Sequence, residues 1–114
     1  MPWNLDSDRP IFLQIVERLE SDIVSGKYAP GEKLPAVREL AVEAAVNPNT
    51  MQKACAELER NGLVYSQRTS GRFVTEDKDR IDQTRKELAK KTVKEFLQRM
   101  EKLGISRDEA MKLL

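Results

Sequence analysis

Two short helical patterns lie on either side of a three-residue gap, and this spacing constrains the fold more than any other feature of the chain. The first pattern follows Pro35 and runs through Ala44, with apolar residues at helical spacing. The second begins at Pro48, directly after Asn47, which is a favourable N-cap residue. Because the gap at 45–47 is so short, the two segments predict a helix-turn-helix.

A further helix and a β-hairpin flank this pair. Between residues 10 and 25 the apolar positions recur at helical spacing, and we expect a helix that Asp8 caps and Gly26 ends. Residues 63–75, LVYSQRTSGRFVT, have an apolar start, a polar centre and an apolar end. That pattern is typical of a hairpin, with its tip near residues 69–71.

The last third of the chain has a different composition. A long helix is predicted from about Arg80 to Lys102, and Ser106 and Glu109 have the capping-box spacing that starts a second, short helix. We therefore predict a mainly α protein with a small β-hairpin wing. It consists of a winged helix-turn-helix domain over residues 1–77 and a two-helix dimerisation tail over residues 78–114.

The residue types present exclude several classes of function. The chain has one cysteine and no histidine, so an internal disulfide, a zinc site and a histidine-based catalytic triad are ruled out. We expect no catalysis, no metal and no cofactor. No stretch approaches the roughly 20 apolar residues that span a bilayer, and the first ten residues lack the pattern of a signal peptide. We expect a cytoplasmic protein without membrane contact.

Acidic residues are missing from two windows, at 44–56 and 61–75, although the formal net charge of the chain is only +1. A phosphate backbone would be repelled least at these windows. In the first window, Asn49 and Lys53 lie on the polar face of the helix that begins at Pro48. Asn pairs with adenine edges, and Lys reaches guanine or phosphate. This face suits double-stranded DNA, although a solvated surface helix has the same pattern.

Thr50 and Gln52 flank that polar face and have matching chemistry. A threonine methyl contacts thymine methyls, and glutamine pairs with adenine. On the other side of the same helix, four apolar residues repeat at i, i+3, i+4 and i+7, namely Met51, Ala54, Cys55 and Leu58. We expect this second face to be buried.

The hairpin tip offers a second basic surface. Arg68 and Arg72 flank Thr69, Ser70 and Gly71, which are small enough to approach a groove or a phosphate closely. An ordinary solvated turn is the alternative for this segment taken alone. Next to a helix-turn-helix, the combination favours DNA contact.

Arg38 lies one turn into the first helix of the pair. Its side chain either extends toward DNA or pairs with a surface acid such as Glu39 or Glu43. Spacing alone favours the surface ion pair.

Residues 10–74 resemble the winged-helix domain of GntR-type bacterial transcription regulators. The resemblance rests on motif residues that follow one another along the chain: Pro10, Gln14, Ile15, Gly26, Pro30, Gly31, Leu34, Pro35, Arg38, Glu39, Leu40, Ala41, Val46, Asn49, Thr50, Leu58, Gly62, Leu63, Gly71, Phe73 and Val74. The sequence VNPNT at 46–50, together with the short tail, is most similar to the YtrA-type subfamily.

This resemblance implies that Arg38, the start of the third helix and the wing contact operator DNA. The implied DNA-binding residues are Arg38, Asn47, Asn49, Thr50, Gln52, Lys53, Arg68, Thr69, Ser70, Gly71 and Arg72. It also implies a homodimer, formed through the tail, that binds an inverted repeat. We expect such a protein to act as a repressor.

The sequence departs from the pattern of the family in three places. Ala36 stands where a serine usually caps the second helix, so a cap worth about 0.5–2 kcal/mol is missing. Pro48 stands where many relatives carry a basic residue. In the wing, Thr69 and Ser70 replace a common Gly-Lys, and Arg72 takes a position that is often threonine. The wing cation has therefore moved.

The tail carries an apolar stripe, and exposed stripes of this kind mark interaction surfaces. Pairing with a second copy would cover it, and the residues expected at that contact are Leu88, Val93, Phe96, Leu97 and Met100. The alternative is that the long helix folds back on its own domain. For the whole chain, two other functions stay open: a winged-helix module that binds protein instead of DNA, and a sensor whose small-molecule effector binds between subunits.

Overall fold

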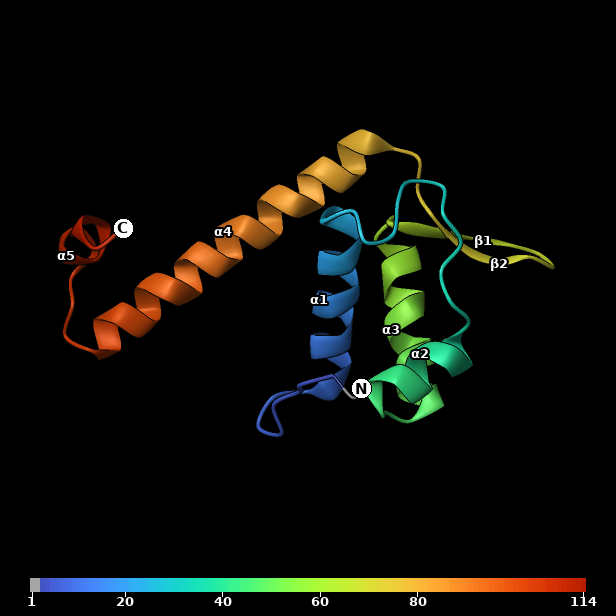
Figure 1. Ribbon diagram of the computed structural model, residues 1–114, viewed down its shortest axis with the longest axis horizontal. Helices are drawn as coiled ribbons and strands as arrows, with labels where there is room; N and C mark the ends of the chain where they lie inside the picture. Colours follow the sequence, from blue (N-terminus) through green and yellow to red (C-terminus); the bar gives the residue numbers. More distant parts are fainter. Residues whose placement is uncertain (1–2) are drawn as a thin grey trace.

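The computed structural model describes residues 3–114 (Figure 1). Its elements follow in the order α1 (Ile11–Val24), α2 (Val37–Ala44), α3 (Pro48–Arg60), β1 (Val64–Gln67), β2 (Gly71–Val74), α4 (Lys78–Lys102) and α5 (Arg107–Lys112). The predicted fold class, a winged helix-turn-helix followed by two helices, is confirmed. The long helix begins slightly earlier than expected, at Lys78.

One hydrophobic core holds the first three helices and the sheet together. α1 packs against α3, and α2 packs against α3 near the turn that joins them (Figure 1). The largest fully buried side chains come from the three helices, from strand β2 and from the residue before β1: Ile15, Leu19, Ile23, Leu40, Met51, Cys55, Leu58, Leu63 and Val74. Each helix contributes the residues of its apolar stripe, which is why periodicity in the sequence predicted the architecture.

The start of α1 differs from the prediction. The helix begins after Pro10 without any side-chain cap, so the predicted capping by Asp8 is wrong. The buried Gln14 organises this end of the helix instead. Its Oε1 accepts from the Asp6 backbone N–H at 2.7 Å, and its Nε2 donates to the carbonyls of Asp6 and Arg9. This amide, which both donates and accepts, fixes the turn that carries Asp8, and the first N–H groups of α1 receive no side-chain hydrogen bond.

The helix-turn-helix itself has one capped and one uncapped helix. α2 has no side-chain cap, as Ala36 predicts. α3 is capped by Asn47, whose side-chain oxygen accepts from the Asn49 N–H at 2.7 Å, with Pro48 at the first helical position. Between the helices Ala45 adopts a left-handed φ of 60°, a conformation that costs an alanine about 1–2 kcal/mol. Packing between α2 and α3 keeps the turn in this form.

The wing consists of β1, β2 and the turn at 68–70, close to the predicted tip. The two strands pair antiparallel over their full length. Lys33 forms an isolated bridge with Phe73, and the Leu34 N–H donates to the Arg72 carbonyl at 2.9 Å. The segment before α2 therefore lies along β2 and brings the wing next to the start of α2.

The tail, residues 78–114, is only partly packed on the winged domain. Along α4 only Ile81 and Thr84 are buried. Nearby, Arg85 donates to the Val24 carbonyl at 2.9 Å through Nη2. Beyond this contact α4 runs away from the domain and carries α5 at its far end (Figure 1). The alternative, a helix that folds back on its own domain, describes the first half of α4, which contacts α1 through Arg85 and through the Lys91–Glu17 ion pair, but not the second half.

Both tail helices begin at side-chain caps. Asp77 accepts from the backbone N–H groups of Asp79 and Arg80, and Ser106 forms the predicted capping box with Glu109. No helix in the described part of the chain is long and apolar enough to cross a membrane.

Candidate nucleic-acid interface

α3 presents two faces of opposite character, as its sequence predicted. The buried residues of the helix are Met51, Ala54, Cys55 and Leu58. On the opposite side Asn49, Gln52 and Lys53 are exposed, and Thr50 is half-buried. The tail lies on the other side of α1 and does not cover this polar face (Figure 1).

Arg38 lies close to the beginning of α3. Its side chain shares a shallow groove with Ala36, Val37 and Pro48, and it is exposed. Glu39 lines the same groove, yet Arg38 forms no ion pair with any of residues 3–114. The surface ion pair that spacing alone favoured is therefore absent from the described chain.

The tip of the wing approaches the same region. Arg68, Thr69, Ser70 and Gly71 are all exposed, and the last three line a depression together with residues 33–37. The structure thus brings three predicted groups to one side of the molecule. We call this the α3–wing surface: Arg38, the polar face of α3 and residues 68–72.

Gly71 is required by its surroundings. Its φ of 106° is unfavourable for residues with a side chain, and an added Cβ would lie 3.1 Å from Cε of Lys33. The contact also identifies Lys33 as an exposed base next to the wing tip, which the sequence analysis did not single out. Its only sequence signal was its place in a short extended segment. Pairing of that segment with β2 was not visible in any periodicity.

Arg72 is not a free cation like its neighbour Arg68. Its Nε donates to Oε1 of Glu59 at 3.2 Å, and its Nη1 donates to Oε1 of Gln52 at 3.4 Å. The hydroxyl of Ser66 donates to the same Glu59 oxygen at 2.6 Å. Arg72 therefore joins strand β2 to two side chains of α3.

The ionisation of Glu59 follows from this cluster. The hydrogen bond from Ser66 lowers the pKa of the Glu59 carboxyl most, and Arg72 lowers it further through its hydrogen bond and its charge. Glu59 therefore stays ionised and balances the charge of Arg72. Within residues 3–114, the bases of this region that lack a carboxylate partner are Lys33, Arg38, Lys53 and Arg68. Such charges are free to neutralise phosphates.

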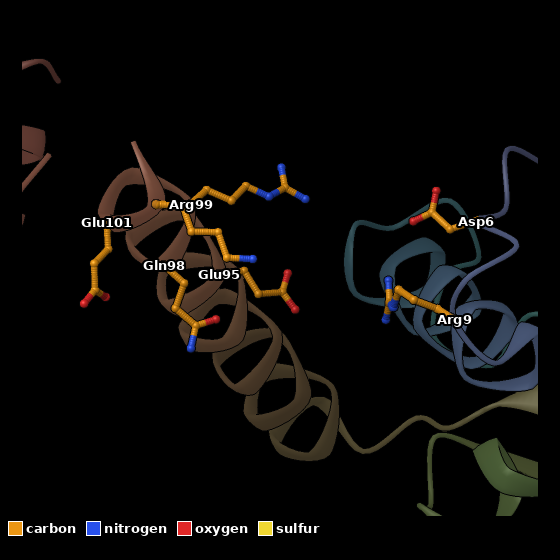
Figure 2. Close-up of a pocket in the computed structure, with 7 residues that line it drawn as sticks. Asp6, Arg9, Glu95, Gln98, Arg99 and Glu101 are labelled. Atoms are coloured by element: carbon orange, nitrogen blue, oxygen red, sulfur yellow. The ribbon is translucent and has the colours of Figure 1, made fainter. Parts of the chain in front are cut away.

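A second concave region separates the winged domain from the far half of α4. It is an open cleft of about 760 Å³. Figure 2 shows Asp6 and Arg9 on the side of the N-terminal segment, with Glu95 and Arg99 across the gap on α4. Both walls are polar and carry charges of both signs, and no group of three potential metal ligands occurs in the described residues.

Four of the predicted dimerisation residues, Val93, Phe96, Leu97 and Met100, lie on the projecting part of α4, whereas Leu88 precedes Lys91, which still pairs with Glu17 of α1. Val93 has 56% of its surface exposed, and Leu88, Phe96, Leu97 and Met100 are half-buried. Further large apolar side chains are exposed toward the end of the tail, at Leu103, Met111, Leu113 and Leu114. Nothing within the protomer covers these residues fully.

A helix-turn-helix with a β-hairpin next to its second helix defines the class of winged helix-turn-helix DNA-binding proteins. Residues 12–74 match the family described as bacterial regulatory proteins, gntR family. The chain belongs to this family, and it is a DNA-binding transcriptional regulator and not an enzyme.

Known proteins extend this likeness beyond the winged domain. A solved GntR family transcriptional regulator from Listeria monocytogenes is 42% identical, with a TM-score of 0.84 and 96% of each chain covered. The transcriptional repressor YtrA from Bacillus subtilis is 42% identical over 71 residues, which are 62% of this chain and 55% of YtrA. The crystal structure of AraR(DBD) in complex with operator ORX1 is 33% identical, with a TM-score of 0.57, and covers 66% of this chain and 92% of that one.

Proposed function

We propose that the chain is a repressor that binds an inverted-repeat operator as a homodimer. In this proposal residues 1–77 form the DNA-binding domain and residues 78–114 the dimerisation tail. The observation that carries it is the α3–wing surface, where exposed polar side chains of α3 lie beside bases that have no carboxylate partner. A surface with this composition fits the edges of bases flanked by phosphates.

Each part of this surface has its own proposed role. The first turns of α3 enter the major groove, where Asn49, Thr50, Gln52 and Lys53 contact bases or adjacent phosphates. Asn47 caps the helix and directs its N-terminal end at the DNA backbone. This proposal is supported by the crystal structure of AraR(DBD), a protein of similar fold, in complex with operator ORX1.

The remaining groups act mainly on the DNA backbone. Arg38 is exposed at the start of α2, close to Pro48 of α3, and Arg68 is exposed on the wing. Both are proposed to contact phosphates. Thr69, Ser70 and Gly71 allow the wing to approach the DNA closely. Arg72 belongs to the same surface, but its side chain already bonds Glu59 and Gln52.

Dimerisation is proposed through the tail. Val93, Phe96, Leu97 and Met100 follow Lys91, which pairs with Glu17 of α1, and none of them is buried within the protomer. A helix of 25 residues is about 37 Å long, so two such tails can hold two α3 helices about one DNA turn apart, roughly 34 Å, or a multiple of it. Repression is proposed because YtrA from Bacillus subtilis is a transcriptional repressor. We place the protein in the cytoplasm, where the DNA is.

The replacement Arg38→Ala tests the DNA-binding role. Binding to the operator, selected from the DNA next to the gene, should weaken by about tenfold because a phosphate contact and its counterion release are lost. Arg60→Ala is the matched control, since Arg60 lies at the far end of α3 and pairs with Glu57. Fluorescence anisotropy at matched salt measures both. Equal affinities for Arg38→Ala and the wild type would exclude this role for Arg38.

A protein-binding module without DNA affinity is the competing function. The two differ in their response to salt, because DNA binding through phosphates gives an affinity that falls linearly on a log-log plot against salt. Absence of duplex binding at low salt would favour the protein-binding module. A dimer that binds DNA in a salt-dependent manner would support the repressor.

A further inference from the structure

We propose that Arg72 determines which bases Gln52 recognises, because its hydrogen bond to the Gln52 carbonyl oxygen fixes the amide with the N–H donors facing away from Arg72 and free for DNA. The inference rests on the proposed function, in which α3 lies in the major groove. It goes beyond that function by assigning a specificity role to a wing residue that need not touch a base.

The geometry fixes Arg72 more firmly than the other wing arginine. Arg72 has 20% of its side chain exposed, while Arg68 is exposed and unpaired within residues 3–114. Glu59 anchors the guanidinium at 3.2 Å, and Ser66 holds the same carboxylate oxygen at 2.6 Å. From this position Nη1 of Arg72 reaches Oε1 of Gln52 at 3.4 Å.

The orientation of the Gln52 amide follows from the chemistry of its neighbour. A guanidinium has only N–H donors and accepts no hydrogen bond. The Gln52 atom that faces Arg72 must therefore be the carbonyl oxygen, since a flipped amide would place its NH₂ group against a cation. The NH₂ group is left to face away from Arg72.

This orientation changes what Gln52 can recognise. A free glutamine binds adenine with two hydrogen bonds, donating to N7 and accepting from N6. Arg72 occupies one of the two lone pairs of the Gln52 oxygen and holds that oxygen toward the wing. The amide is therefore not free to turn its oxygen and its NH₂ group together toward one adenine, and the NH₂ donors are the part best placed for a base. Guanine offers two acceptors in the major groove, O6 and N7, and thymine offers O4, whereas cytosine offers a donor. We therefore expect Gln52 to favour guanine or thymine over adenine and cytosine.

The test compares base preferences by selection from a random duplex library followed by sequencing. The wild type defines the operator, and Gln52→Ala identifies the position in each half-site whose preference depends on Gln52. At that position the wild type should favour guanine or thymine. Arg72→Met, which keeps an apolar side chain but removes the donors, should raise the preference for adenine about tenfold, as expected for gain of a bidentate pair.

Two further variants control this comparison. Arg68→Met removes the same charge from the wing without touching Gln52, so base preference should stay unchanged while the salt dependence of binding falls by about one ion. Glu59→Ala keeps Arg72 but removes its anchor, and it should shift the preference toward adenine by a smaller amount. Circular dichroism shows whether Arg72→Met folds. If it does not, Glu59→Ala tests the same contact between Arg72 and Gln52.

Several outcomes would overturn the inference. One is an Arg72→Met protein with the base preference of the wild type at the Gln52 position. A second is a Gln52→Ala protein that loses no preference at any position. A third is a fall in salt dependence for Arg72→Met as large as that for Arg68→Met, which would place Arg72 on phosphate. If the wild type itself selects no sequence, the proposed function fails, and this result is distinct from the other three.

Discussion

The winged domain and the tail are stabilised in different ways. In the winged domain α1 and α2 begin without side-chain caps, and burial of their apolar stripes holds them in place. In the tail, α4 buries only Ile81 and Thr84, but it starts at the Asp77 cap and carries Asp82 paired with both Arg85 and Lys86. Local interactions of this kind support a helix that lacks a core. The apolar residues of the tail are therefore available for another surface.

Truncation of a buried leucine should show the largest effect. Leu58 of α3 is fully buried, and Leu103 of the tail has 73% of its surface exposed. Leu58→Ala should lower the free energy of unfolding by about 3 kcal/mol, through lost burial and a residual cavity. Leu103→Ala should change it by less than about 0.5 kcal/mol. Urea denaturation followed by circular dichroism measures both, and similar losses would contradict the contrast between the two regions.

A charged residue in the apolar stripe of the tail should weaken dimerisation and leave the winged domain folded. In the proposed dimer Phe96→Asp places a carboxylate in an apolar contact, so the protein should sediment as a monomer and lose at least about tenfold in operator affinity. Val42→Asp is the control for sedimentation, because Val42 is an exposed apolar residue of α2.

The same variant gives a second measurement. The unfolding midpoint of the wild type should rise with protein concentration, as mass action requires of a dimer, and that of Phe96→Asp should not. A Phe96→Asp protein that still sediments as a dimer would move the interface away from the stripe.

Changes at helix caps should have intermediate effects of opposite sign. Ala36→Ser adds the missing cap to α2 and should stabilise the protein by about 1 kcal/mol. Asp77→Ala removes the cap of α4 and should cost a similar amount. Thermal unfolding measures the first change, and hydrogen exchange of the amides of residues 79 and 80 measures the second. If Asp77→Ala leaves those amides equally protected, local capping does not support the tail.

The smallest expected effect concerns the link between α3 and the wing. The pKa of Glu59 is lowered in the folded state. The stability that the ionised carboxylate adds to the folded protein is therefore present above pH 4.5, the ordinary glutamate value, and is lost as the pH falls through the lowered pKa. We expect the Arg72 Nε–H signal in NMR spectra to change over that acidic range. In Glu59→Gln the transition should be absent. A transition that persists in this variant would assign it to another carboxylate.

Periodicity and capping rules predicted most of the fold but less of the site. The helix-turn-helix, the wing and the capping box at Ser106 are local patterns, visible within a few residues of sequence. The Asp77 cap of α4 was not predicted, because the helix was expected to begin at about Arg80. Lys33 beside Gly71, and Arg72 beside Glu59 and Gln52, are contacts between distant segments that no local pattern encodes.

The error at Asp8 has a similar origin. Its sequence position suits a cap, but the buried amide of Gln14 already satisfies the preceding turn. The partial packing of α4 on the winged domain could not be predicted from the sequence either. An apolar stripe on a helix has the same pattern whether it contacts its own chain or a second one.

Because only the first half of α4 contacts the winged domain, a small rotation at that contact moves the far end of the helix. The first half of α4 rests on α1, where Arg85 donates to the Val24 carbonyl and Lys91 pairs with Glu17 at 3.4 Å. About 16 Å of helix follow Lys91, so a rotation of about 10° at these contacts displaces the far end by about 3 Å. In the proposed dimer, a substitution that tilts this half of the helix would therefore alter the tolerated number of base pairs between half-sites while leaving every base-contacting side chain unchanged.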